Sequence, residues 1–318
     1  MSNHTDSPLS IVDRESQSPV IKEPIIIVGN PRSGTSSLFA TFFSHPELWS
    51  LHRESLAILD GPLHPQHRSW ESHAATEADL DAELVPRLKG QFLRQVGNLE
   101  KVPLGRLVSV RGRGKRNAAR AISLMSRPWK RPPLRIVEKT IPNILRIRFL
   151  KALFPDARFV HLVRHPRPNI AAMYRGWRQP QRHNDFPLPP GFEIRGHDGR
   201  YWSFVLPPGW KEQHGRTLME VCSFQWTACH QRCLDDSAAL DPSRYIRVRW
   251  EELVAHPAET LSELATWAEL DPGPFRRFAR GLPRINYARD STKQDVPWQE
   301  VEAVLPQVNE VAERLGYD

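Results

Sequence analysis

The residues best suited to chemistry lie at positions 29–36, which read GNPRSGTS. The two glycines have the spacing of a phosphate-binding loop, and small residues let backbone amides wrap around an oxyanion. Residues 25–28 before the loop are apolar and β-branched, and residues 37–43 after it have helical apolar spacing. Because the first turn of a helix has unpaired amides and partial positive charge, the segment predicts a strand, an anion-binding loop and a helix.

The loop differs from that of a nucleoside triphosphatase at one position. Thr35 follows Gly34, where the triphosphatase loop has a lysine. Without that lysine, the β- and γ-phosphates of ATP or GTP lack their usual cation. Arg32 supplies a cation inside the loop instead, so the loop suits one phosphate that carries a sulfuryl group. We expect hydroxyl donors from the loop and the first helical turn, namely Ser33, Thr35, Ser36 and Ser37.

Polar side chains also follow two other apolar runs. Lys139 comes directly after residues 134–137 and Glu138, and Arg164 follows residues 158–163. A cation at Lys139 would neutralise charge on a bridging oxygen as its bond breaks, and the planar fork of Arg164 matches phosphate oxygens. Since ligand sites of open α/β sheets lie at the carboxyl ends of strands, we expect both near the loop. The alternatives are a surface Lys139 paired with Glu138 and a surface charge at Arg164.

Glu54 and His52 follow the loop, and both carry side chains that can accept a proton. An alcohol is a weak nucleophile at neutral pH, so its proton must leave as a new bond forms. Partial burial raises the pKa of a carboxyl group and lets it accept that proton. His52 is a second candidate for the same task.

The elements that would position these residues alternate along the chain. Apolar runs predict strands at 25–28, 134–137, 158–163 and 245–249, and helices at 37–43, 77–99, 144–154, 170–177, 217–235, 257–269 and 297–315. This alternation predicts an α/β, three-layer fold with a central, mainly parallel sheet flanked by helices. We expect a flexible N-terminal segment at 1–22 and a single domain at 23–318.

Two segments interrupt this alternation. Residues 55–133 predict a helical and basic insertion, whose basic part is 106–131. Residues 178–215 are rich in proline, glycine and aromatic residues, and they predict an ordered irregular loop. We expect its aromatic side chains to pack the loop onto the sheet, with an apolar pocket as the alternative: Phe186, Phe192, Tyr201, Trp202, Phe204 and Trp210.

Composition narrows the class of partner and compartment. The chain has 44 Lys and Arg against 36 Asp and Glu, and its net charge of +8 favours anionic partners. All three cysteines lie within 222–233, in a run with helical spacing, which predicts buried thiols in a reducing compartment. No apolar run approaches the ~20 residues of a membrane span, and the N-terminus lacks an apolar signal core. We therefore expect a cytoplasmic protein.

The loop and the segment 138–142 resemble motifs of a known superfamily. Pro-Arg-Ser-Gly-Thr after a short apolar strand resembles the 5′-phosphosulfate loop of sulfotransferases that use PAPS (3′-phosphoadenosine 5′-phosphosulfate). The sequence of the loop is similar to that of the bacterial, tyrosylprotein and heparan sulfate branches. Glu-Lys-Thr-Ile-Pro resembles the Glu-Lys-Thr/Ser-Pro motif of the bacterial and heparan sulfate branches. The resemblance covers residues 24–54, 134–177 and 217–270. It implies a P-loop-like fold and in-line transfer of a sulfuryl group from PAPS to an acceptor hydroxyl, with an amine in second place and PAP as product.

The resemblance also implies a role for each candidate residue. Glu54 lies 22 residues after Arg32 and would be the general base, while the steroid and aryl branch uses a histidine, which favours His52 as the alternative. Lys139 and Arg32 would be catalytic cations at the bridging oxygen. The donor would be bound by Arg32, Ser33, Gly34, Thr35, Ser36, Ser37 and Arg164, the last at the 3′-phosphate. The implied acceptor is a small molecule, a lipid or a carbohydrate, with no metal required and no nucleic acid expected.

One position departs from the family pattern. The family has a serine eight residues after the arginine of the 3′-phosphate site, and this chain has Ala172 there. Arg167, Arg289 and Lys293 are the candidates to replace that contact. Two other functions stay open: a P-loop nucleotide kinase or hydrolase, and a non-catalytic protein that binds polyanions through residues 106–131.

Overall fold

The computed structural model describes residues 20–43, 45–51, 54–69, 71–98, 134–179, 185–197, 200–280 and 296–318. Within them, five strands form one parallel sheet in the order β2-β3-β1-β4-β7. Their bounds are Ile25–Gly29 (β1), Trp49–Ser50 (β2), Ile136–Glu138 (β3), Arg158–Val163 (β4) and Tyr245–Arg249 (β7). The predicted α/β fold with a mainly parallel sheet is therefore confirmed.

β1 is the middle strand of the sheet, and it pairs with both β3 and β4. Every residue of β1 and β4 is buried, as expected for parallel strands that are covered on both faces. Alternate side chains of β1 enter two different cores: Ile26 and Val28 belong to one hydrophobic cluster, and Ile25 and Ile27 to the other. The sheet is thus the middle layer of three.

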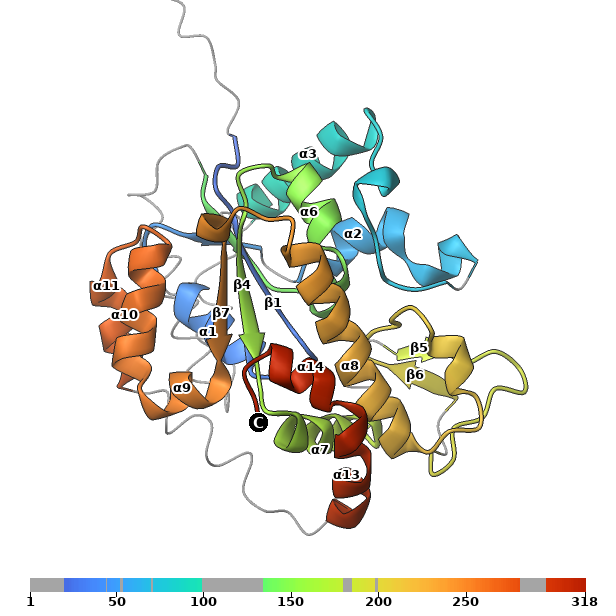
Figure 1. Ribbon diagram of the computed structural model, residues 1–318. Coiled ribbons are helices and arrows are strands. Elements are labelled where there is room, and N and C mark those ends of the chain that lie inside the picture. The colour runs from blue at the N-terminus through green and yellow to red at the C-terminus, as the bar shows by residue number, and fades with distance from the viewer. Residues whose placement is uncertain are drawn as a thin grey trace, which may run out of the picture.

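Helices cover both faces of the sheet (Figure 1). One face carries α1 (Thr35–Phe43), α9 (Trp250–Ala255), α10 (Pro257–Trp267) and α11 (Pro272–Ala279). The other carries α6 (Ile147–Leu153), α7 (Pro166–Trp177), α8 (Leu218–Ser237), α13 (Trp298–Val304) and α14 (Asn309–Arg314). α2 (Leu56–Leu63) and α3 (Leu84–Asn98) share their core with α6.

Short 3₁₀-helices and one hairpin complete the described residues. The 3₁₀-helices are Pro65–Arg68, Glu77–Asp79, Ile141–Leu145, Trp210–Gln213, Pro242–Arg244 and Leu305–Gln307. β5 (Asp185–Pro187) and β6 (Tyr201–Ser203) pair antiparallel as a separate two-stranded sheet. No helix in this part of the chain is long and apolar enough to cross a membrane.

Prolines account for several differences between the predicted and observed helices. The helix predicted at 297–315 is divided, because Pro306 lies in the 3₁₀-helix that separates α13 from α14 and cannot donate a helical hydrogen bond. The helix predicted at 144–154 is shorter, because Ile144 and Leu145 belong to the preceding 3₁₀-helix Ile141–Leu145, which contains Pro142 near its start. The two-residue strand β2 is too short to give a periodic signal in sequence.

Two expectations for side chains are met. Cys222, Cys229 and Cys233 are free thiols buried in α8. In the aromatic loop, Trp202 and Trp210 are buried with ring centroids 5.6 Å apart, so these rings pack the loop as predicted. The N-terminal residues 1–19 and the basic residues 106–131 lie outside the described residues.

Candidate active site

The loop between β1 and α1 has a backbone shaped for close approach to an anion. Arg32 has φ 65° and Gly34 has φ 105°, both in the left-handed region. The amide of Ser33 donates to the carbonyl of Asn30 at 3.2 Å, and the amide of Ser37 donates to the carbonyl of Gly34 at 2.8 Å. The helical hydrogen bonds of α1 thus begin at Gly34, so the amides between Gly34 and Ser37 are those that a helix start presents to an oxyanion.

Both glycines of the loop are required by their surroundings. A Cβ atom on Gly29 would lie 2.6 Å from the carbonyl oxygen of Leu162 and 2.7 Å from Cγ2 of Thr35. A Cβ atom on Gly34 would lie 2.4 Å from the ring of Trp250, the first residue of α9. The loop is therefore enclosed by β4 on one side and by an indole ring on another.

The loop contains buried polar atoms that have no protein partner. Ser33 is fully buried, and its Oγ makes no hydrogen bond. The side-chain nitrogen and oxygen of Asn30 are also buried and make no hydrogen bond. Buried polar groups are normally paired, so such groups in a folded loop mark a place that a ligand can satisfy. A hydroxyl and an amide NH₂ are donors to a phosphate oxygen, and the loop therefore fits the predicted 5′-phosphosulfate group. The remaining hydroxyls differ: Thr35 is buried, Ser37 is half-buried and Ser36 is exposed.

Arg164 and Asn169 bring the end of β4 and the start of α7 against this loop. The Nη1 of Arg164 donates to the carbonyl of Arg32 at 3.1 Å, and the Nδ2 of Asn169 donates to the carbonyl of Pro31 at 2.9 Å. Both side chains are buried. Arg164 thus lies beside the loop as predicted, whereas Asn169 was not identified from the sequence. Its one signal was its place, five residues after Arg164 in the first turn of the following helix.

The residues that could replace the missing serine at the 3′-phosphate do not all lie near the loop. Ala172 is buried in α7. Arg167 pairs with Glu302 of α13 at 2.5 Å, and its guanidinium lies 4.5 Å from the ring centroid of Trp298. Arg167 is thus engaged with α13. Arg289 and Lys293 lie outside the described residues.

Lys139 and Glu54 form the charged pair of the site. Lys139 follows β3 and is 7% exposed, and its ammonium group contacts the Glu54 carboxylate, whose side chain is 36% exposed. The alternative pairing of Lys139 with Glu138 is not observed. β3 runs parallel to β1 and pairs with it directly. The Lys139–Glu54 pair and the loop therefore both lie at the carboxyl end of these strands. His52 lies outside the described residues.

Glu138 is buried beside this pair and accepts three hydrogen bonds. The donors are the hydroxyl of Thr140, the Nδ2 of Asn143 and the backbone amide of Ser55, the last at 3.2 Å. Burial raises the pKa of Glu138, and the hydrogen bonds from Thr140 and Ser55 oppose that effect. The sequence showed Glu138 only as a neighbour of Lys139, although a glutamate that directly follows an apolar strand is an unusual feature.

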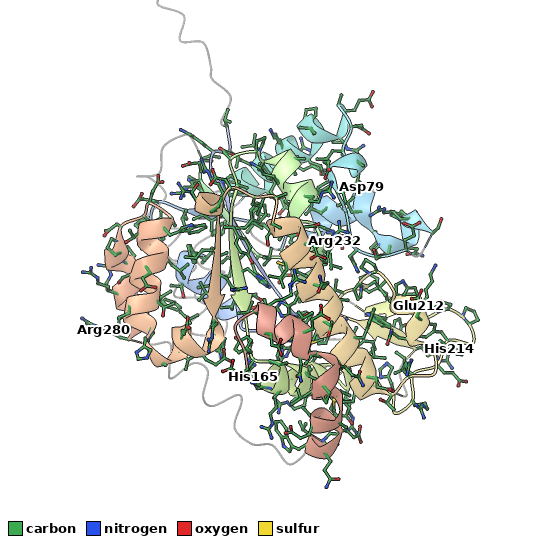
Figure 2. All side chains as sticks on the ribbon, in the orientation of Figure 1. Asp79, His165, Glu212, His214, Arg232 and Arg280 are labelled. Carbon is green, nitrogen blue, oxygen red and sulfur yellow. The ribbon has the colours of Figure 1, made fainter. Side chains whose placement is uncertain are left out.

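Tyr317, next to the C-terminus, packs at the carboxyl end of β7. Glu251 accepts from the amide of His165 at 3.1 Å and from the hydroxyl of Tyr317 at 2.8 Å. The guanidinium of Arg249 lies 4.9 Å from the Tyr317 ring centroid. Figure 2 shows His165 beyond the carboxyl ends of β4 and β7, where it begins α7. These contacts fix the backbone that follows Arg164.

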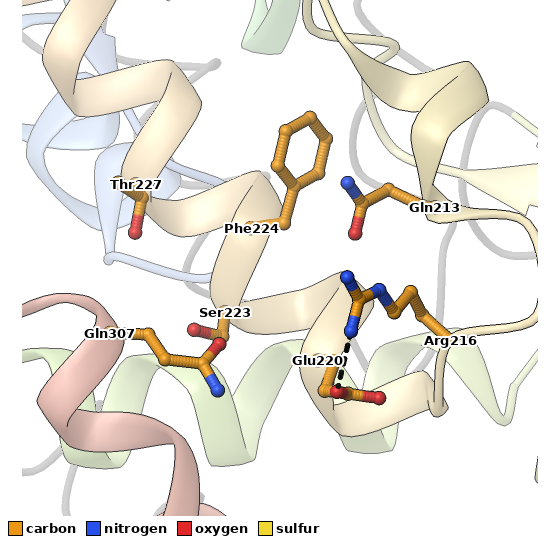
Figure 3. A pocket seen from close by; sticks show the side chains of 7 residues that line it. All are labelled: Gln213, Arg216, Glu220, Ser223, Phe224, Thr227 and Gln307. Atoms are coloured by element: carbon orange, nitrogen blue, oxygen red, sulfur yellow. Dashed lines mark hydrogen bonds and ion pairs between the residues drawn. The ribbon is translucent and has the colours of Figure 1, made fainter.

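A separate concave surface lies beside α8 (Figure 3). Its volume is about 360 Å³, and its lining includes Phe224, Gln307 and the ion pair of Arg216 with Glu220 at 3.5 Å. None of the predicted site residues lines it. It is therefore distinct from the site at the sheet edge.

The sequence matches the model of the Sulfotransferase family over residues 24–187, just over half of the chain, and the protein belongs to this family. No curated protein matches the chain. Among solved structures, the chain is similar to a sulfotransferase from Alicyclobacillus acidocaldarius, with 15% identity, a TM-score of 0.49, and coverage of 94% of this chain and 98% of that one. It is also similar to the sulfotransferase STF9 from Mycobacterium avium, with 16% identity, a TM-score of 0.49, and coverage of 95% and 78%. For the mouse sulfotransferase SULT7A1 complexed with PAP, the identity is 11%, the TM-score 0.41, and the coverage 93% and 83%.

Proposed function

We propose that this sulfotransferase takes its sulfuryl group from PAPS and transfers it directly to an acceptor hydroxyl. The observation that carries the proposal is the contact between the buried Lys139 ammonium and the half-buried Glu54 carboxylate, at the sheet edge that holds the anion-binding loop. A base and a cation at one edge are the two groups that sulfuryl transfer requires: one to accept the proton of the hydroxyl and one to neutralise the leaving oxygen.

The loop residues would hold the 5′ end of the donor. When bound, PAPS supplies a sulfuryl group on a phosphate leaving group. The amides from Gly34 to Ser36 and the hydroxyls of Ser33, Thr35, Ser36 and Ser37 are the proposed donors to that phosphate. The unpartnered Ser33 hydroxyl supports this assignment. We assign the 3′-phosphate to Arg164, which is tied to the loop through the Arg32 carbonyl.

Glu54 and two cations would act on the reacting atoms. As the acceptor oxygen bonds to sulfur, Glu54 takes the hydroxyl proton, and the bond between sulfur and the bridging oxygen of PAP breaks. Lys139 and Arg32 stabilise the charge that develops on that oxygen, so the reaction requires no metal. Atoms balance as PAPS plus alcohol giving PAP, sulfate ester and a proton.

The acceptor is proposed to be a small molecule, a lipid or a carbohydrate with a free hydroxyl. Trp202, Phe204 and Trp210 are buried in packing, so the acceptor contacts come from other residues of the site. The free, buried thiols of α8 support a reducing compartment such as the cytoplasm.

A direct test uses the purified protein with ³⁵S-labelled PAPS and a panel of alcohols, phenols, sterols and oligosaccharides. We expect PAP release that depends on the acceptor, and we expect PAP to bind in calorimetry. An Arg32→Ala variant should lose both, while an Arg280→Ala variant, altered at an exposed arginine after α11, should lose neither. Failure of the wild-type protein to bind PAP or PAPS, or magnesium-dependent turnover of ATP, would contradict the proposal.

A further inference from the structure

We propose that Glu138 is a positioning residue for the base: its carboxylate holds the peptide bond between Glu54 and Ser55, and so fixes the Glu54 carboxylate against Lys139. The inference rests on the proposed function, because it concerns the residue that would accept the proton. It gives a role to a glutamate that contacts neither of the two catalytic side chains through its own carboxylate.

Three donors converge on the buried Glu138 carboxylate. The Thr140 hydroxyl and the Ser55 amide donate to Oε1, and the Asn143 Nδ2 donates to Oε2. Asn143 and Thr140 come from the segment that follows β3, whereas Ser55 comes from the segment that leads into α2. The carboxylate therefore joins two segments that are 83 positions apart in sequence.

Thr140 supports the same contact from a second direction. The Ser55 amide also donates to Thr140 Oγ1 at 2.9 Å, and the two hydroxyl oxygens lie 3.1 Å apart. On its other side, the Ser55 carbonyl accepts from the amides of Ile58 and Leu59 at 2.9 and 2.8 Å, which starts α2. Ser55 is thus held through its amide, its hydroxyl and its carbonyl.

This anchor determines where Glu54 lies. The Ser55 amide belongs to the peptide bond that contains the Glu54 carbonyl, so fixing that amide fixes the Glu54 backbone. The Glu54 side chain is held at its other end by Lys139. With both ends defined, the carboxylate has little freedom to leave the orientation that a proton acceptor needs.

The tripeptide 138–140 can make both contacts because its backbone is extended. Thr140 has φ −134° and ψ 133°, and successive side chains of an extended chain point to opposite sides. Glu138 and Thr140 therefore share one side and hold the Ser55 amide, while Lys139 points to the other side and contacts Glu54. Because side chains alternate along this tripeptide, two of them hold the Ser55 amide and the third contacts the Glu54 carboxylate.

The donor set makes Glu138→Gln a sharp test. All three neighbours of the carboxylate donate hydrogen bonds, and a carboxylate only accepts. A glutamine has nearly the same shape, but its NH₂ group would face a donor. We expect E138Q to lower kcat about 10- to 100-fold, the scale of a small misplacement of a reacting group, with PAP affinity and the KM for PAPS unchanged. Glu77→Gln, at an exposed glutamate paired with Arg148, should change neither value.

A double-mutant cycle separates positioning from an independent effect. If Glu138 acts through Glu54, the variant E138Q/E54Q should have nearly the same kcat as E54Q alone. Losses that multiply would overturn the proposal. Thr140→Ser keeps the hydroxyl and should retain the rate, whereas Thr140→Val should resemble E138Q and provides the same test if E138Q does not fold.

Amide hydrogen exchange gives a readout that needs no acceptor. In E138Q, peptides covering residues 54–63 should exchange faster than in the wild-type protein, while peptides covering β4 should not change. Unchanged exchange at 54–63 would overturn the positioning role. If the wild-type protein fails to bind PAPS, the proposed function fails, and the exchange result still decides whether Glu138 holds the Glu54–Ser55 peptide.

Discussion

The two ends of the central sheet differ in how their polar side chains are paired. At the amino end, acidic and basic side chains pair with one another: Arg244 contacts Glu23 at 2.9 Å, and Arg158 contacts both Glu23 and Glu269. At the carboxyl end, Lys139 also pairs with Glu54, but in the loop after β1 the Ser33 hydroxyl and the Asn30 amide are buried without a partner. Paired charges hold the fold together, whereas unsatisfied donors lower its stability until a ligand satisfies them. The unpartnered groups of this loop lie where we propose that the donor binds.

The largest expected effect tests the carboxyl end through its base. Glu54→Gln removes the proposed proton acceptor but keeps the shape of the side chain, so transfer should fall on the order of 10²- to 10⁴-fold. PAP binding by calorimetry and the unfolding midpoint should stay near the wild-type values. A variant that keeps its rate would remove Glu54 from the mechanism and would favour His52.

The next effect concerns the shape of the loop. Gly34→Ala would place a Cβ atom against Trp250 at a residue with φ 105°, so the loop must shift. We expect PAP affinity to fall on the order of 100-fold, as when a donor of an oxyanion site is lost, and stability to fall by about 1–3 kcal/mol. Gly61→Ala is the matched control, since a Cβ atom there meets nothing within 4 Å and the site lies in α2. That variant should bind PAP normally.

A third prediction concerns the middle of the sheet, where His161 bonds to His230 at 3.0 Å and to Tyr245 at 2.7 Å. Burial lowers the pKa of His161, and it lowers the pKa of His230 to about 3. In the unfolded chain both rings have a pKa near ~6.5, so the unfolded state binds more protons as the pH falls below that value. Between pH 6.5 and 5, the free energy of unfolding should fall by about 2 kcal/mol from His230, and His161 should add a fall in the same direction.

Urea unfolding at several pH values measures this slope. His230→Phe should flatten it, and His256→Gln, at an exposed histidine, should leave it as in the wild-type protein. A wild-type stability that does not change between pH 6.5 and 5 would contradict the assignment. The result would also show whether acid sensitivity arises from the middle of the sheet rather than from its charged ends.

The smallest expected effect tests the amino end. Glu23→Gln weakens the pairs with Arg244 and Arg158 and should lower the free energy of unfolding by about 1 kcal/mol, because these pairs are only partly buried. Transfer activity should not change. A loss of activity with unchanged stability would contradict the division of roles between the two ends.

The sequence predicted the parts of the site that are encoded locally. The glycine spacing, Arg32 and the apolar run before them lie within a dozen residues, so the strand, loop and helix could be predicted together. Four of the five strands could be predicted for the same reason, since three are apolar runs and β7 has β-branched residues alternating with arginines. β2 has two residues and depends on its pairing with β3, which no local pattern reveals.

The contacts between distant segments could not be predicted in this way. Lys139 and Glu54 are 85 positions apart, and the pairing of β2 with β3 brings their segments together. The sequence therefore allowed Lys139 to pair with its neighbour Glu138. Asn169 could not be identified because its partner is a backbone carbonyl, which leaves no residue-type signal.

The central place of β1 has a consequence for the order in which the site can be completed during synthesis. The loop after β1 leaves the ribosome before the two side chains that hold its carbonyls, which lie 132 and 138 positions further along the chain. Contacts over such separations form slowly, and they require the intervening chain to be available. The loop is thus synthesised well before the side chains that hold it, so a nascent chain that ends before α7 lacks two of the contacts that shape the candidate anion-binding loop.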